Sequence, residues 1–118
     1  MAAVESDRLY GTLNLLVLQT LEQGRRHGLA ILREIEAAAT SLKIEEGALY
    51  PALHRLERDG CLEGEWGLSE SRRRAKFYRL TDRGRQRLRG EVESWVDHTR
   101  AVAAVLGLEL ELAAGVSA

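Results

Sequence analysis

Apolar side chains recur at helical spacing in three segments of the first half of the chain. Residues 9–22 are apolar on nearly every side, residues 29–39 have a single apolar stripe, and residues 44–59 have one apolar and one polar face. Gly24 and Gly60 follow the first and third segments, where glycine is a typical helix stop. The pattern predicts three helices, and the first of them needs burial on two sides.

From residue 61 the spacing of apolar side chains changes from helical to alternating. Residues 61–68 and 75–80 alternate as half-buried strands do, and the polar residues 69–74 between them predict a turn. Thr81 is a favourable helix cap, and residues 83–106 after it predict one helix, roughly 36 Å long at about 1.5 Å per residue. The predicted fold is therefore mainly α with a small β-hairpin: three helices, a two-stranded wing and a long C-terminal helix, the order of a winged helix-turn-helix.

This order divides the chain into three predicted parts. Residues 1–81 form the winged helix-turn-helix domain, residues 82–108 form the C-terminal helix, and residues 109–118 form a weakly patterned, flexible tail.

The composition is that of an ordinary globular protein. Of the 118 residues, 45% are hydrophobic and 30% are charged, which is far from the composition of disordered chains. The N-terminal run MAAVESDR lacks the features of a signal peptide, and no apolar run reaches the roughly 18 residues of a membrane span. Cys61 is the single cysteine, so no disulfide forms within the chain. We expect a cytoplasmic protein with no membrane contact.

The charge is close to balanced overall but is unevenly distributed. The formal net charge is -1, yet residues 72–89 contain nine basic side chains against Asp82 alone. A positive stripe of this density is typical of a surface that binds phosphate groups. A solvated basic face is the alternative interpretation.

The third predicted helix has two chemically different faces. Its core face consists of apolar side chains, namely Leu49, Ala52, Leu53 and Leu56. The opposite side offers small, aromatic, imidazole and guanidinium groups that suit base edges and phosphates in a major groove, so the candidate DNA contacts are Gly47, Tyr50, Pro51, His54, Arg55 and Arg58. In the alternative, the arginines only pair with neighbouring acidic side chains. Since Pro51 lacks an amide hydrogen, we expect the helix to begin late or to kink near Tyr50.

The predicted turn between the strands is rich in arginine. Arg72, Arg73 and Arg74 follow one another, and Lys76 comes next on the return strand. Contact with phosphates would relieve the repulsion among these charges, and an arginine at the tip can enter a minor groove. A solubilising loop is the alternative.

Three runs together resemble the PadR family of winged-helix transcriptional regulators: HGLAILREIE from His27, EEGALYPALHRLERDG from Glu45, and EWGLSESRRRAKFYRLTDRGRQRL from Glu65. The resemblance covers roughly residues 9–95. It implies that the third helix enters the major groove through Tyr50, Pro51, His54 and Arg55, and that Arg72 to Lys76 touch the backbone or minor groove. Ala48 departs from the family pattern, in which a hydroxyl residue is common at this position. A phosphate or cap contact that such a hydroxyl could make is therefore lost at residue 48.

The last predicted helix carries apolar residues and one threonine at spacings of 4, 3, 4, 3 and 4, which is a heptad seam; its members are Leu88, Val92, Trp95, Thr99, Val102 and Leu106. This seam predicts a homodimer in which the first helix offers Leu13 and Leu16. Packing within one chain is the alternative for part of it. The PadR resemblance also implies dimerisation through these two helices, as in the compact subtype with a single short C-terminal helix. Two DNA-reading helices per dimer would favour a pseudo-palindromic operator.

The two tryptophans receive different predictions. Trp95 lies in the middle of the seam. The PadR resemblance implies a site there for a small hydrophobic effector, because aromatic residues of some relatives line a cavity for flat hydrophobic ligands; interface packing is the alternative. Trp66 is expected to pack the wing onto the core. Cys61, beside Leu62, is expected to be a buried thiol.

These features favour a sequence-specific DNA-binding regulator that acts as a homodimer, with repression as the family expectation. A winged-helix module for protein contact is an alternative, as is a regulator that senses a ligand at its dimer interface. His27, His54 and His98 lie on three different elements and no catalytic or metal-binding spacing occurs, so we expect no catalytic residues, no metal and no cofactor.

Overall fold

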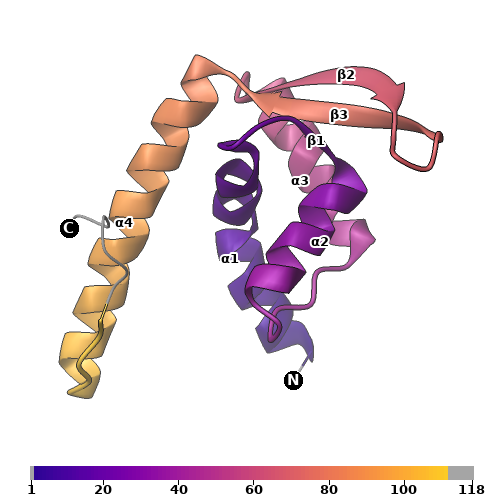
Figure 1. Cartoon of the computed structure of the whole chain (residues 1–118). Helices are drawn as coiled ribbons and strands as arrows, with labels where there is room; N and C mark the ends of the chain where they lie inside the picture. The colour runs from indigo at the N-terminus through magenta and orange to yellow at the C-terminus, as the bar shows by residue number, and fades with distance from the viewer. Residues whose placement is uncertain (1, 112–118) are drawn as a thin grey trace.

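The computed structural model describes the backbone of residues 2–111 and the side chains of residues 12–111 (Figure 1). Within these residues the elements follow in the order α1 (Ala2–Leu21), β1 (Arg26–His27), α2 (Gly28–Ala38), α3 (Glu46–Arg58), β2 (Leu62–Leu68), β3 (Arg74–Leu80) and α4 (Asp82–Leu106). The prediction of a mainly helical fold with a small hairpin and a long last helix is confirmed. Residues 112–118 of the predicted tail lie outside the described residues.

The sheet contains one strand that the sequence pattern did not predict. Its order is β1-β3-β2, and both pairings are antiparallel. β1 is only two residues long, Arg26 opposite Tyr78 and His27 opposite Phe77, so it has too few positions for an alternating pattern to be recognised. It ties the chain between α1 and α2 to the wing, which we define as β2, β3 and the turn that joins them.

Most helix ends in the structure lie within two residues of the predicted ends, and local capping residues mark several of them. His27 caps α2, since its Nδ1 accepts a hydrogen bond from the amide of Ala30 at 3.2 Å. Thr81 caps α4 as predicted, with its hydroxyl oxygen accepting from the amide of Gly84 at 3.0 Å. Gly107 ends α4 in the left-handed conformation with φ of 73°.

The expected late start of the third helix is wrong. α3 begins at Glu46 and contains Pro51. The hydrogen bond that Pro51 lacks would have gone to the carbonyl of Gly47, four residues earlier. Because Gly47 is exposed, water can satisfy that carbonyl, and the helix accommodates the proline close to its first turn.

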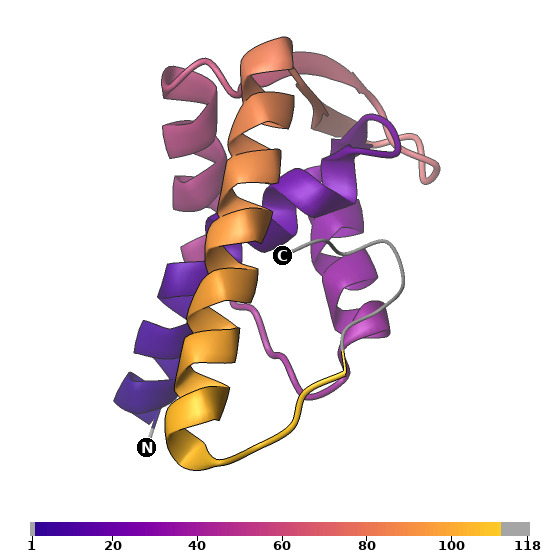
Figure 2. The same ribbon diagram turned by 90° about the vertical axis from the view of Figure 1, so that its left-hand side faces the viewer.

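The core lies between the first three helices, the base of the sheet and the start of α4. Its fully buried side chains come from all of these elements and include Leu13, Val17, Leu18, Leu21, Ile31, Leu49, Leu53, Leu56, Leu62 and Leu88. Cys61 is buried among them, as predicted. α4 then leaves this core and runs beside α1 (Figures 1 and 2). No helix in the described part of the chain is long and apolar enough to cross a membrane.

Candidate nucleic-acid interface

The two predicted faces of α3 are present in the structure. The four apolar side chains Leu49, Ala52, Leu53 and Leu56 are completely buried. Gly47, Tyr50, Pro51, His54 and Arg58 are exposed, and Arg55 is half-buried. The helix is therefore anchored along one side and offers the other, with its imidazole and guanidinium groups, to a partner.

Tyr50 is exposed but its ring is held in place by the start of α2. A Cβ added at Gly28 would lie 2.7 Å from Cε1 of Tyr50 and 3.0 Å from its hydroxyl oxygen, so the ring rests directly against a backbone that has no side chain. This contact fixes the first turns of α3 against α2, the pairing that defines a helix-turn-helix. In the sequence, Gly28 of the run HGLA is the residue that could have indicated this contact.

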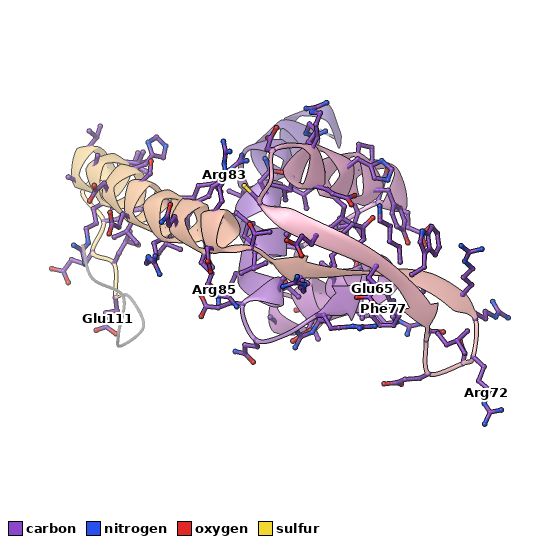
Figure 3. The ribbon with its side chains drawn as sticks, turned by 90° about the horizontal axis from the view of Figure 1, so that it is seen from above. Glu65, Arg72, Phe77, Arg83, Arg85 and Glu111 are labelled. Atoms are coloured by element: carbon purple, nitrogen blue, oxygen red, sulfur yellow. The ribbon has the colours of Figure 1, made fainter. Side chains whose placement is uncertain are left out.

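The turn of the wing and the start of β3 carry three exposed arginines. The amide of Ser69 donates to the carbonyl of Arg73 and the amide of Arg72 to the carbonyl of Ser69, both at 2.9 Å. Arg72 itself has φ of 60°, which is uncommon for a residue with a side chain. Arg72, Arg73 and Arg74 are all exposed, and Figure 3 shows Arg72 at the tip, pointing away from the rest of the protein.

Lys76, another predicted DNA contact, has a partner within the chain. Its Nζ lies 2.8 Å from Oε1 of Glu57 on α3, and both side chains are about half-buried. The hydrogen bond to Glu57 raises the pKa of Lys76, and the ammonium also lies 5.4 Å from the ring of Tyr78. The structure thus gives Lys76 a role in joining β3 to α3, which sequence reasoning missed because the two partners are 19 residues apart.

The prediction that Trp66 packs the wing onto the core is wrong. The register pairs Leu62 with Leu80 and Gly64 with Tyr78, and the core ends at this second pair. Trp66 is one step further out and is 58% exposed. Its ring instead carries the guanidinium group of Arg74, whose Cζ lies 4.6 Å from the ring centroid.

The other face of the sheet uses its charges differently. Arg79 on β3 forms an ion pair with Glu63 on β2, and the guanidinium of Arg25 lies 4.3 Å above the ring of Phe77. Figure 3 shows Arg83 and Arg85 at the start of α4, at the opposite end of the wing from its tip. The basic run of the sequence is therefore divided in space, and only its first part, residues 72–76, lies at the outer half of the wing.

The comparisons with known proteins agree with this geometry. Residues 17–90 match the profile of the transcriptional regulator PadR-like family, which is more than half of the chain. The chain belongs to the PadR-like family of transcriptional regulators. Members of this family act by binding DNA and not as enzymes, so no catalytic role is assigned to this PadR-like chain.

Individual regulators, some of them with solved structures, are also similar to this chain. The chain is similar to a PadR family transcriptional regulator from Eggerthella lenta, with 32% identity, a TM-score of 0.74, and coverage of 89% of this chain and 90% of that one. It is also similar to a transcriptional regulator from Clostridium thermocellum, with 27% identity, a TM-score of 0.75, and coverage of 83% and 96%. A third relative, transcriptional regulator Rv3488 of Mycobacterium tuberculosis, is 39% identical over 62 residues, which is 52% of this chain and 55% of that protein.

PadR-like regulators typically dimerise, and α4 of this chain has an apolar surface of its own. The predicted seam is divided between two directions. Leu88 is buried in the chain's own core, as is Leu13 on α1, whereas Leu16, Val92 and Thr99 are half-buried. Trp95 and Val102 are each 43% exposed, and Leu106 is exposed as well.

The side of α4 that faces its own chain is one position away from the predicted seam. Val96 and Ala103 are buried together with Leu88, and none of the sequence reasoning singled out those two residues. Residues 95 and 96 are separated by about 100° around the helix. A pattern of apolar residues at heptad spacing therefore does not decide which of the two faces the chain's own core. On α4 of this PadR-like chain the exposed large apolar side chains are Trp95, Val102, Val105 and Leu106.

Proposed function

We propose that this chain is a sequence-specific DNA-binding regulator that acts in the cytoplasm as a homodimer and represses transcription from a pseudo-palindromic operator. The observation that carries the proposal is the juxtaposition of two surfaces. α3 is anchored along one side and has an open polar face, and the wing beside it ends in three exposed arginines. An exposed helix face next to a cationic hairpin suits a major groove and the backbone or minor groove beside it.

In this proposal the residues of α3 and the wing have different tasks. Tyr50, His54 and Arg58, with Gly47 and Pro51 allowing close contact, face the base edges, and Arg55 supports them at the side. Arg72, Arg73 and Arg74 neutralise phosphates or enter the minor groove. Lys76 acts mainly through Glu57, because its ammonium is already paired.

The proposed dimer surface consists of Leu16, Val92, Trp95, Thr99, Val102 and Leu106. Leu13 and Leu88 are left out, since their side chains are buried within one chain. Exposed tryptophan and valine on one side of a long helix favour association with a second apolar surface. Trp95 is also the place at which a flat hydrophobic effector would bind.

Fluorescence anisotropy tests the proposal with a labelled duplex from the promoter of the chain's own gene and a scrambled duplex of equal length. We expect tighter binding to the promoter duplex and a steep salt dependence. Each lost phosphate contact lowers the log-log salt slope by roughly 0.9, so replacing Arg72, Arg73 and Arg74 with Ala should lower it by about 2 to 3 per chain.

The matched control replaces three exposed arginines of α4, Arg83, Arg89 and Arg100, with Ala. This control variant loses the same charge at a distance from the wing tip. Its affinity for the promoter duplex should therefore fall far less than that of the wing variant. Equal binding to both duplexes would contradict sequence-specific recognition. Equal affinity of the wing variant and the unmodified chain would contradict the assignment of the wing, and no binding at all would favour a protein-contact module.

A further inference from the structure

We propose that Trp66 is a DNA-contacting residue of the wing, which holds the guanidinium group of Arg74 on its ring and packs against the sugar-phosphate backbone beside the groove that α3 enters. This inference rests on the proposed function, and it deepens that function by naming a neutral aromatic contact in a wing otherwise described by its charges.

The direction of the Trp66 side chain follows from the sheet. Residues at alternate positions of a strand point to the same face, so Trp66 points the same way as Leu62, which is buried in the core. Across the strand pair Trp66 is opposite Lys76, and Lys76 reaches α3 through Glu57. Trp66 therefore lies on the face of the sheet that α3 covers, one step beyond the end of the core.

More than half of the surface of Trp66 is open to solvent. Its exposed fraction is 58%, and the guanidinium group of Arg74 lies over its ring. Large aromatic side chains are usually buried in a core or in an interface, so an exposed indole on this face suggests a partner that covers it. Its surroundings are cationic, because Arg72, Arg73 and Arg74 stand at the same end of the wing. A polyanion matches these charges better than a second copy of the chain or an acid-poor protein surface.

The contact with Trp66 also prepares Arg74 for a phosphate. A guanidinium group has five N–H donors, so one that is held over a ring can still donate to phosphate oxygens. The ring limits the conformations of a long side chain, so less entropy is lost when the contact forms. Trp66 would in this way act both as a surface for the backbone sugars and as a support for Arg74.

The direct test observes Trp66 itself. The chain contains two tryptophans, so labelling with 5-fluorotryptophan gives two ¹⁹F resonances, and the Trp66→Phe variant assigns them. We expect the Trp66 resonance to shift or broaden as promoter duplex is added, and to saturate at the same duplex concentration as the anisotropy signal.

Affinity measurements complete the test. Trp66→Ala should weaken duplex binding roughly tenfold, the size of an aromatic contact with nucleic acid, and Trp66→Phe should restore most of the loss. Because the two side chains act together, the Trp66→Ala, Arg74→Ala double variant should bind much more tightly than two independent losses would allow. Leu68→Ala, an exposed apolar neighbour, and Arg79→Ala, on the other face of the sheet, are the controls and should change affinity less than threefold.

The outcomes separate this inference from the proposed function. If the unmodified chain does not bind the duplex, the proposed function fails. If it binds, but the Trp66 resonance is unchanged at saturation and Trp66→Ala binds normally, the inference about Trp66 is overturned while the function stands. Circular dichroism checks that Trp66→Ala is folded. The ¹⁹F titration is carried out on the chain that keeps a tryptophan at position 66, so it does not depend on the folding of a variant.

Discussion

Nζ of Lys76 on β3 lies 2.8 Å from Oε1 of Glu57 on α3, so an ion pair joins the wing to the helix proposed to read DNA. Gly64 on β2 makes room for this pair, since a Cβ there would overlap Cε of Lys76 and lie 2.9 Å from Oε2 of Glu57. The position of the wing relative to α3 therefore depends on a contact between two charged residues that are far apart in the sequence.

Breaking the ion pair between Lys76 and Glu57 should lower the stability of the protein. Lys76→Met and Glu57→Gln should each lower the free energy of unfolding by about 0.5–1 kcal/mol, as expected for a partly exposed pair, and their effects should not be additive. Urea unfolding of both variants and of the double variant measures this coupling.

The same variants separate the two roles of Lys76 in binding. If the pair positions the wing, Glu57→Gln and Lys76→Met should weaken binding to the promoter duplex to a similar extent. A Lys76 that contacts phosphate directly would give another result: Lys76→Met would lower the salt slope by about 0.9, and Glu57→Gln would not.

The protein should lose stability in alkaline solution, because Lys76 and Tyr78 hold their protons more tightly in the folded state than in the unfolded chain. The hydrogen bond to Glu57 raises the pKa of Lys76 above its ordinary 10.5, and burial raises the pKa of Tyr78 above its ordinary 10.0. The folded state thus favours the protonated form of both groups, so their stabilisation is complete below the unfolded values and is lost as the pH rises above about 10.

Urea unfolding at several pH values between about 8 and 11 measures this loss. The Lys76→Met, Tyr78→Phe variant has neither group, so its stability should fall less steeply over the alkaline part of this range. An identical slope in the variant and the unmodified chain would show that neither group contributes.

Two glycines of α4 should respond in opposite ways to alanine. A Cβ at Gly84 would overlap the backbone carbonyl oxygen of Cys61, which cannot move aside as a flexible side chain can, whereas a Cβ at Gly90 meets nothing within 4 Å. We expect Gly84→Ala to lower the free energy of unfolding by roughly 1–3 kcal/mol, the cost of an overpacked contact.

Gly90→Ala is the matched control on the same helix. It should raise the free energy of unfolding by about 0.5–1 kcal/mol, because alanine loses less conformational entropy than glycine in a helix. Thermal unfolding followed by circular dichroism compares the two variants. An unchanged free energy of unfolding in Gly84→Ala would contradict the close packing of α4 against the carbonyl of Cys61.

The exposed apolar surface of α4 should decide the oligomeric state. Light scattering of the unmodified chain should give twice the chain mass of 13.2 kDa, and the Trp95→Asp, Val102→Asp variant should give the mass of one chain. Carboxylates at these two exposed positions would have to be buried without partners in the dimer, which is strongly unfavourable.

Ala101→Asp provides the control, since Ala101 is exposed and lies on the side of α4 away from both Trp95 and the buried Val96. It should leave the dimer intact. A Trp95→Asp, Val102→Asp variant with unaltered mass would show that this surface is not the dimer contact.

The sequence by itself determined the order and type of the main elements, the two faces of α3, the arginine-rich tip of the wing and the resemblance to PadR regulators. These features depend on local periodicity, on caps such as Thr81 and on short motifs, all of which can be read from neighbouring residues. Only the tertiary structure decided that Lys76 is paired with Glu57, that Trp66 lies beyond the core, and that Val96 rather than Trp95 faces the chain itself. Those outcomes depend on where the core ends and on contacts between distant residues, and a one-position change in the phase of a helix face is too small for a sequence pattern to resolve.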